Sequence, residues 1–417
     1  MNTYDVIIIG GGAAGMMAAI SAKKQNPESR VAILDRTFEL GRKLLTAGAG
    51  RGNLTNVNLE NGPSGYYHGD QSAITTVFSK FGYSEIMHFF DELGVPTYLE
   101  VKTGKGKIFP KIDHAKTIRD MLVEYLKFLR IDIYCDTAVT AITKGEHFIL
   151  ITSKGEYTAS RIVVSAGGKT YPALGSDGSG YTIAASFGHT IVEPVVSAVP
   201  VVSKNVLSHF LQGEKMEMRA TSYIDGTELS SAQGDVMFTQ YGFSGPAIFD
   251  ISRDFSIRIN REHKAGCSVR LCFFPDETGE SLMAILEKRW HAYPQYSVAA
   301  SLWGLVTQKV AGGVCAALKF PKEKIANELS PEDKQAICAM LYSFESPVEA
   351  TRGWNEGEFT AGGVSLSDVD PNTMQSRLTP GLFFAGEILD VDGAVGGFNL
   401  SWGWATGWIA GKHAASS

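Results

Sequence analysis

The sequence predicts an α/β protein in which a Rossmann-like nucleotide-binding domain is interrupted by an inserted, mainly β domain and a small helical domain. Three observations lead to this prediction. The β-branched apolar run Val6–Ile9 leads into a glycine turn and a small-residue helix. Short β-rich runs fill residues 191–275. A second strand-and-glycine element returns near the C-terminus, from Gly381 to Gly386.

Composition narrows the class of protein. The chain has 417 residues, 44% hydrophobic and 20% charged, as expected of a soluble globular protein with two or three domains. Its net charge of −6 disfavours a nucleic-acid partner or an anionic membrane surface. Five scattered cysteines without C-x-x-C, and no His-rich cluster, indicate neither a disulfide framework nor a metal site. No signal peptide or long apolar run is evident, so we expect a cytoplasmic protein that does not enter a membrane.

The N-terminal turn fits G-x-G-x-x-G through Gly10, Gly12 and Gly15. In this motif the glycines allow a tight turn, close approach of the backbone to a pyrophosphate, and close helix–strand packing. The helix that follows offers free N–H groups to phosphates, which brings Ala13 and Ala14 into the predicted site. A glycine turn of another α/β protein is the alternative.

The second strand, Arg30–Leu34, ends on Asp35, about twenty residues after the motif. Its carboxylate suits the ribose hydroxyls of an adenosine, and Arg36 follows it. The next loop, Gly41–Asn53, is too rich in glycine for a helix interior and carries Arg42, Lys43 and Arg51. These features suit a second stretch of dinucleotide phosphates, whereas a flexible surface loop is the alternative.

Residues 70–130 are predicted to be mainly helical, with amphipathic stretches at Ser84–Leu93 and Ala115–Leu129. Between them lies the basic turn Lys102–Lys111, which suits a phosphate of an incoming nicotinamide cofactor or is simply a solvated loop. Strands are expected at 131–134 and 138–142, and a hairpin at 147–158. A third buried strand begins at Arg161 and ends in Gly167-Gly168. The end of this stretch is similar to a phosphate-binding P-loop. A P-loop needs glycine where Val163 stands, so we reject an NTPase.

The inserted region changes from strands to helices. Helices are predicted at Gly279–Trp290, Val298–Gln308 and Pro331–Tyr342, the last with Ser330 as N-cap. The predicted domains are residues 1–190 with 356–417 for nucleotide binding, 191–275 with 343–355 for the β domain, and 276–342 for the helical domain.

The C-terminal segment distinguishes between FAD and NAD as the cofactor. A strand ends at Gly386-Glu387, and the Gly396-Gly397 turn leads into a helix beginning near Phe398 and ending at Ala414. A dinucleotide fold split by an insertion and closed in this way favours a Rossmann-like FAD-binding domain (glutathione-reductase-like) over a simple NAD domain. The helix would then aim its N–H groups at the flavin ring. An ordinary strand–loop–helix is the alternative.

The whole chain resembles the two-domain flavoproteins grouped with bacterial aminoacetone oxidases and BaiN-type 3-dehydro-bile-acid reductases. The matching motifs are Gly10–Gly15, Gly41-Arg-Lys43, Gly50-Arg51, Asn53–Asn56, Ile108–Pro110, Ala166–Pro172, Phe243–Ala247, Thr360–Val364, Gly386-Glu387, Asp390–Gly393 and Gly396–Asn399. The resemblance implies non-covalent FAD, an inserted β domain and a helical cap over the flavin. The remaining predicted cofactor residues are Gly50, Gly52, Asn53, Leu54, Val139, Ala166, Gly167, Gly168, Gly386, Glu387, Asp392, Gly396, Gly397, Phe398, Asn399 and Leu400.

Three positions depart from the family pattern. Relatives usually carry cysteine where Gly52 stands and often glycine where Ala49 stands. Relatives also often have histidine at Gln240. Reactions that use that thiol or imidazole are therefore in doubt for this chain.

The resemblance and the residues predict an FAD-dependent oxidoreductase. Two mechanisms stay open: an NAD(P)H-fed reductase of a small organic acceptor such as an enone, and an amine oxidase that uses O₂. Because no second G-x-G-x-x-G follows a strand, any NADH or NADPH is expected to dock only transiently. Tyr171 is the candidate proton donor, with a packing role as the alternative. A tRNA-acting flavoprotein and a non-catalytic flavin-binding module are further alternatives, and the sequence leaves the oligomeric state open.

Overall fold

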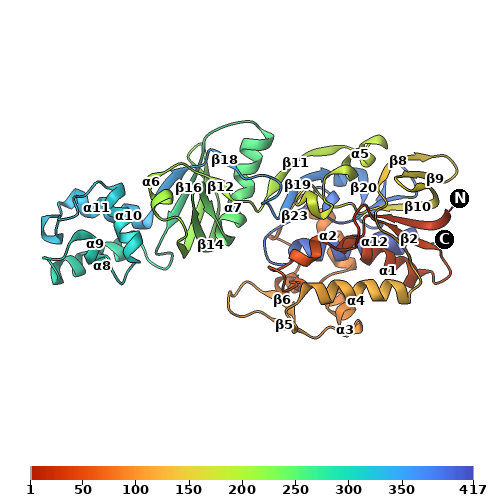
Figure 1. Ribbon diagram of the computed structural model, residues 1–417, viewed down its shortest axis with the longest axis horizontal. Helices are drawn as coiled ribbons and strands as arrows, with labels where there is room; N and C mark the ends of the chain where they lie inside the picture. The colour runs from red at the N-terminus through yellow and green to blue at the C-terminus, as the bar shows by residue number, and fades with distance from the viewer. Residues whose placement is uncertain (1, 417) are drawn as a thin grey trace. The chain divides into compact units, whose positions relative to one another are not determined.

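The computed structural model describes residues 2–416 and divides into two compact units. The first comprises the described residues up to Val196 together with those from Glu358 onward, and the second runs from Ser197 to Gly357. In Figure 1 the units can be followed by the labels β2, β10 and α12 for the first, and β14, β16 and α8 for the second. The further division of the second unit into a β domain and a helical domain stays a prediction.

The core of the first unit is a parallel sheet. Its strands lie in the order β22-β10-β1-β2-β7, with β20 and β21 added antiparallel beyond β22. β1 and β2 are β-branched and buried, as expected for central parallel strands. The long strand β10 pairs with β9 over its first half and with β22 over its last residues.

The first unit is assembled from the following elements. Its strands are β1 Asn2–Ile9, β2 Val31–Leu34, β3 Thr55–Asn56, β4 Tyr67–His68, β5 Thr97–Leu99, β6 Lys107–Pro110, β7 Asp132–Tyr134, β8 Val139–Lys144, β9 Phe148–Thr152, β10 Gly155–Val164, β11 Ile191–Ser197, β19 Phe359–Val364, β20 Val369–Asp370, β21 Gln375–Ser376, β22 Leu382–Phe384 and β23 Asp392–Gly393. Its helices are α1 Ala13–Gln25, α2 Gln71–Lys80, α3 Tyr83–Glu92, α4 Ala115–Phe128, α5 Ser179–Ser186 and α12 Phe398–Ala414.

Helices α1 and α12 pack closely through small residues. A Cβ added at Gly407 would lie 2.3 Å from the Ala14 carbonyl oxygen, and one at Gly411 would lie 2.0 Å from that of Ala18. Gly407 and Gly411 are four residues apart, as are their partners Ala14 and Ala18, and the two contacts follow the same order along both helices. The helices therefore run parallel, with their N-termini toward the same end. Because α1 starts where β1 ends, both N-termini lie near the carboxyl edge of the sheet, where open α/β sheets bind ligands.

The second unit is a seven-stranded antiparallel sheet with helices. The strand order is β17-β16-β13-β14-β15-β12-β18. The strands are β12 Val201–Val202, β13 Lys215–Ile224, β14 Thr227–Thr239, β15 Gly242–Ser244, β16 Cys267–Cys272, β17 Phe344–Pro347 and β18 Ala350–Thr351. The helices are α6 Val206–Phe210, α7 Pro246–Ser256, α8 Gly279–Ala292, α9 Val298–Ser301, α10 Gln308–Ala317 and α11 Pro331–Tyr342.

The predicted elements compare well with the observed ones, with one clear error. The helix expected at Val298–Gln308 is wrong: α9 ends at Ser301 and α10 starts only at Gln308. The break contains Gly304 at φ +86°, a left-handed conformation that a helix cannot contain. The start of α11 is confirmed, since the Ser330 side chain accepts a hydrogen bond from the Asp333 N–H. Within residues 2–416, every helix is too short or too polar to cross a membrane.

Candidate functional site

The N-terminal turn places its three motif glycines in different surroundings. A Cβ at Gly10, where φ is +97°, would lie 2.6 Å from the Ser165 carbonyl oxygen, and one at Gly15 would lie 1.9 Å from that of Gly10. A Cβ at Gly12 would meet no atom of residues 2–416 within 4 Å. Gly10 and Gly15 are therefore required by the turn itself, whereas Gly12 borders space that the protein leaves open.

This open space fits a dinucleotide pyrophosphate. Gly12 is also the N-cap of α1, and no side chain caps that helix end. The first N–H groups of α1 are thus left for a ligand, and the positive end of the helix dipole favours an anion. The residues present at this end of the sheet suit the diphosphate of FAD.

Asp35 lies beside the same turn and is 8% exposed. Its Oδ2 accepts a hydrogen bond from the Gly11 N–H at 2.6 Å, and its Oδ1 accepts from the Thr37 N–H and hydroxyl at 2.7 and 2.6 Å. A carboxylate offers about four acceptor positions, so these bonds orient the group and leave room for a ribose hydroxyl.

A polar cluster connects Lys43 of the glycine-rich loop to Glu387 of the C-terminal segment. Lys43 Nζ lies 2.7 Å from Glu387 Oε2 and donates a hydrogen bond to the Thr170 hydroxyl at 2.7 Å. Glu387 Oε1 accepts from the Thr360 N–H at 3.0 Å, and the Thr360 hydroxyl accepts from the Lys169 N–H. Two predicted cofactor residues, Lys43 and Glu387, thus form a half-buried ion pair with charge-assisted hydrogen bonds.

The second glycine turn leads into α12. Gly396 and Gly397 have φ values of +133° and +104°, and a Cβ at Gly397 would lie 2.6 Å from the Thr55 carbonyl oxygen. No side chain caps the N-terminus of α12. The Asn399 side chain bonds to both backbone groups of Gly393, which fixes the preceding strand β23 against the helix start. The turn therefore presents backbone N–H groups, as the first turn does.

The three predicted arginines are held by neighbours in the structure. Arg36 pairs with Asp177, and Arg42 donates to the Ala173 carbonyl oxygen. Arg51 lies 4.1 Å from the Phe109 ring centroid and donates to the Tyr98 hydroxyl. Their side chains are therefore oriented by contacts within the protein.

The other predicted residues lie in several elements of the first unit. Ala13, Ala14, Ala166, Gly167, Gly168 and Gly386 surround the carboxyl ends of β1, β10 and β22, and Gly50, Gly52 and Asn53 lie in the loop before β3. Leu54 and Phe398 are only 1% and 3% exposed, so their side chains belong to the core and only their backbone is available. Leu400 lies in the first turn of α12, Asp392 is buried in β23, and Val139 begins β8, paired with Thr152 on β9.

Two buried hydroxyls near this edge were missed from the sequence. Ser176 Oγ and Tyr181 Oη are buried, and neither has a hydrogen-bond partner among the described residues. Ser176 lies against Gly167, since a Cβ there would be 2.9 Å from its oxygen, and Asp177 next to it holds Arg36. Unpaired buried polar groups are costly unless a ligand or water satisfies them, so Ser176 also fits a bound cofactor. Only their burial in the fold marks these two hydroxyls as candidate site groups, because Ser and Tyr are common residues in any sequence.

Tyr171, the candidate proton donor, follows β10 in an unusual conformation. Its φ is +57°, which is uncommon for a residue other than glycine and is typical of functional sites when the fold enforces it. Burial and the nearby Glu358 carboxylate raise the pKa of its hydroxyl, so it holds its proton at neutral pH. Its neighbour Thr170 is fully buried in the Lys43–Glu387 cluster.

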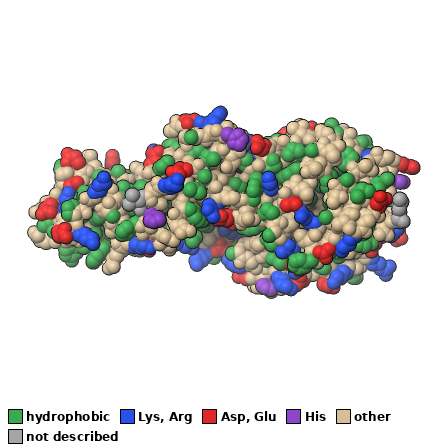
Figure 2. All heavy atoms as spheres, turned by 45° about the horizontal axis from the view of Figure 1, so that its top comes forward, with side chains coloured by type: hydrophobic (Ala, Val, Ile, Leu, Met, Phe, Trp, Pro, Cys, Tyr) green, Lys and Arg blue, Asp and Glu red, His purple; other side chains and the backbone are tan. Residues whose placement is uncertain are grey.

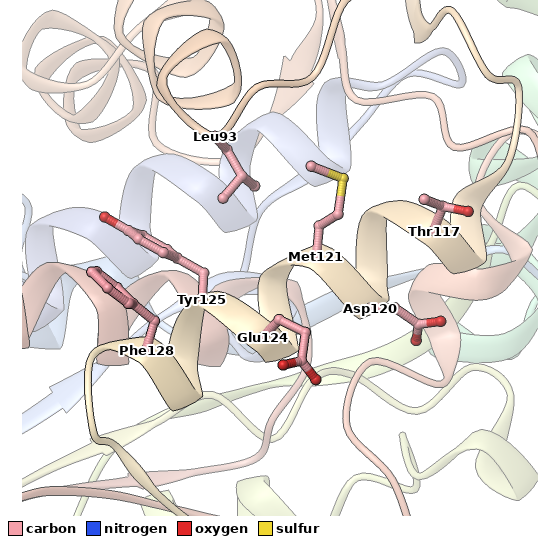
Figure 3. A pocket seen from close by; sticks show the side chains of 7 residues that line it. All are labelled: Leu93, Thr117, Asp120, Met121, Glu124, Tyr125 and Phe128. Carbon is pink, nitrogen blue, oxygen red and sulfur yellow. The ribbon is translucent and has the colours of Figure 1, made fainter.

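A separate groove lies on the outer face of α4. It has a volume of about 500 Å³ and is lined by Leu93, Thr117, Asp120, Met121, Glu124, Tyr125 and Phe128 (Figure 3). None of the predicted site residues lines it, so it is not the candidate site.

Acidic and basic side chains are interspersed on the face shown in Figure 2.

Comparison with known proteins identifies the family. The family model described as the HI0933-like protein Rossmann domain matches residues 4–413. The chain is 33% identical to a 3-dehydro-bile acid delta(4,6)-reductase of Clostridium scindens, covering 98% of each chain. It is 27% identical to a ribosomal RNA dihydrouridine synthase of Escherichia coli, covering 98% of this chain and 97% of that one.

Solved structures share the fold. A 3-ketosteroid-delta4-(5alpha)-dehydrogenase from Rhodococcus jostii matches with a TM-score of 0.53 and 15% identity, covering 100% of this chain and 97% of that one. A flavocytochrome c3 fumarate reductase matches with a TM-score of 0.51 and 16% identity, over 99% and 78%. At such identities these matches support the Rossmann-like FAD-binding fold alone. From the family match and the full-length relatives, the chain belongs to the HI0933-like Rossmann-domain family and is an FAD-dependent oxidoreductase.

Proposed function

We propose that the protein is an NAD(P)H-fed reductase that saturates a C=C bond conjugated to a carbonyl group, with an enone such as a 3-dehydro-bile acid or steroid as acceptor. The observation that carries this proposal is the 33% identity, over 98% of both chains, to a 3-dehydro-bile acid delta(4,6)-reductase. When bound, FAD supplies hydride transfer between the donor and the acceptor.

The chain itself supplies binding and a proton. We assign the pyrophosphate to the turn at Gly12 and the N-terminus of α1, and the flavin end to the N-terminus of α12. Saturating the acceptor also requires a proton at the carbon next to the carbonyl. Tyr171 suits this role, because its hydroxyl keeps its proton and its backbone is held beside the Lys43–Glu387 cluster.

An RNA substrate is the second candidate. Two relatives, at 27% and 26% identity over nearly their full lengths, are named ribosomal RNA dihydrouridine synthases. Forming dihydrouridine also saturates a C=C bond conjugated to a carbonyl, so the same residues would serve. The net charge of −6 does not favour RNA as a partner, which is why we place the small acceptor first.

The test is an anaerobic half-reaction experiment on the purified yellow protein. We expect NADPH or NADH to bleach the flavin absorbance, and a 3-dehydro steroid to restore it with formation of the saturated ketone. Restoration only by ribosomal RNA would favour the second candidate. Bleaching by aminoacetone but by neither dinucleotide would contradict the proposal and favour an amine oxidase.

A further inference from the structure

The β5–β6 hairpin carries an unusual concentration of positive charge. Lys102, Lys105, Lys107 and Lys111 lie within ten residues of one another. Lys102 and Lys111 are exposed, and Lys105 and Lys107 are half-buried. Such a cluster attracts anions, most strongly where several cations act on one ligand.

Within residues 97–113 the lysines outnumber the acids. Glu100 is 8% exposed, and its carboxylate accepts hydrogen bonds from the backbone N–H and the hydroxyl of Thr103. Asp113 pairs with Arg51 and accepts a hydrogen bond from Tyr98. The segment therefore contains four lysines and only these two acids, one of which Arg51 already neutralises.

The hairpin is attached directly to the second glycine turn. Strand β3 pairs with β6, placing Asn56 opposite Lys107. The Asn56 amide donates to the carbonyl oxygens of both Lys105 and Gly396, at 2.8 and 2.9 Å. A Cβ at Gly396 would lie 3.5 Å from Lys107 Cε. Lys105 and Lys107 thus lie next to the turn that precedes α12, and Lys102 and Lys111 belong to the same hairpin segment.

We propose that this lysine hairpin binds the phosphates of the nicotinamide donor and selects NADPH over NADH. The inference rests on the proposed function, in which the donor must reach the flavin at the start of α12. The donor's phosphates need cations there, because no second G-x-G-x-x-G follows a strand in the sequence. A steroid acceptor carries no phosphate, whereas NADPH carries one more phosphate than NADH.

The test compares K102Q/K111Q with the matched control K80Q/K412Q, which also removes two exposed lysines of the same unit. We follow anaerobic flavin bleaching against NADPH and NADH concentration, and NADP⁺ binding through its perturbation of the flavin spectrum. In the hairpin variant we expect half-saturation by NADPH and the Kd for NADP⁺ to rise about tenfold, as for loss of charge-assisted hydrogen bonds. The limiting rate and the control variant should stay near wild type, and the NADH dependence should shift less than the NADPH dependence, because NADH lacks one of the phosphates.

Three outcomes would overturn the inference. Unchanged NADPH and NADP⁺ dependence in K102Q/K111Q would show that the hairpin does not hold the donor. Weaker binding of ribosomal RNA with unchanged NADP⁺ binding would assign the hairpin to RNA instead. A wild-type protein whose flavin is bleached by neither dinucleotide would refute the NAD(P)H-fed function, and the hairpin proposal with it. If NADPH bleaches the wild-type flavin but the hairpin variant behaves like wild type, only the hairpin proposal fails.

Discussion

The two glycine turns of the first unit lead into the two helices that pack against each other, but they need glycine for different reasons. At the first turn a Cβ on Gly12 would meet no protein atom within 4 Å. At the second turn Gly397 has a φ of +104° and lies against the Thr55 backbone. The fold itself therefore leaves room for a side chain at position 12, whereas the second turn needs glycine at position 397. Substitutions at each turn separate cofactor binding from stability.

The largest effect is expected at Gly12. Gly12→Val places a side chain where we assign the pyrophosphate, without contacting the protein, so the variant should fold and lose its yellow cofactor. The flavin-to-protein absorbance ratio after purification measures this loss. Gly145→Val, at another glycine with open space, is the matched control and should stay yellow. A yellow Gly12→Val protein would show that the pyrophosphate does not lie at this turn.

Substitution of Tyr171 tests for a role in catalysis that is independent of cofactor binding. Tyr171→Phe should retain FAD but lower kcat for the acceptor about 10²–10⁴-fold, the usual contribution of a general acid. The rate of bleaching by the donor should not change, because that step needs no proton from the chain. Stopped-flow measurement of the two half-reactions checks this, and equal loss in both halves would indicate a structural role.

The second turn should respond to substitution with lost stability. Gly397→Ala adds a Cβ 2.6 Å from the Thr55 carbonyl oxygen at a left-handed φ. We expect a loss of about 1–3 kcal/mol from overcrowding, with a further ~1 kcal/mol from the backbone conformation. Thermal or urea unfolding of the cofactor-free protein measures it. Unchanged stability would remove the distinction between the two turns.

A smaller effect on cofactor binding is expected at Asp35. Asp35→Ala removes the acceptor that we assign to the ribose, and the Kd for FAD should rise about tenfold. Asp35→Asn retains an acceptor oxygen and should bind with intermediate affinity. Titration of the cofactor-free proteins with FAD gives all three constants, and three equal values would exclude a ribose contact.

The sequence predicts the local features of this site better than the long-range ones. The strand, turn and helix around Gly12, and the start of α12 near Phe398, follow from patterns within about twenty residues and are confirmed by the structure. The Lys43–Glu387 pair joins residues 344 positions apart, and the short strands β3 and β4 exist only through pairing with distant β6 and β23. Sequence patterns carry no information on such contacts.

Buried hydroxyls show the same limit. Ser176 is recognised only because the fold buries it without a hydrogen-bond partner, and nothing in its neighbouring residues distinguishes it from a loop serine. The helix expected at Val298–Gln308 was wrong because Gly304 adopts a left-handed conformation, which the residue type allows but does not by itself predict.

A crystal structure of the protein purified with its flavin tests the central claim most directly. We predict electron density for FAD with its diphosphate at Gly12 and the N-terminus of α1, its adenosine ribose at Asp35, and its ring system at the N-terminus of α12. Density with the diphosphate at any other helix end, or a flavin ring remote from Gly397, would contradict it.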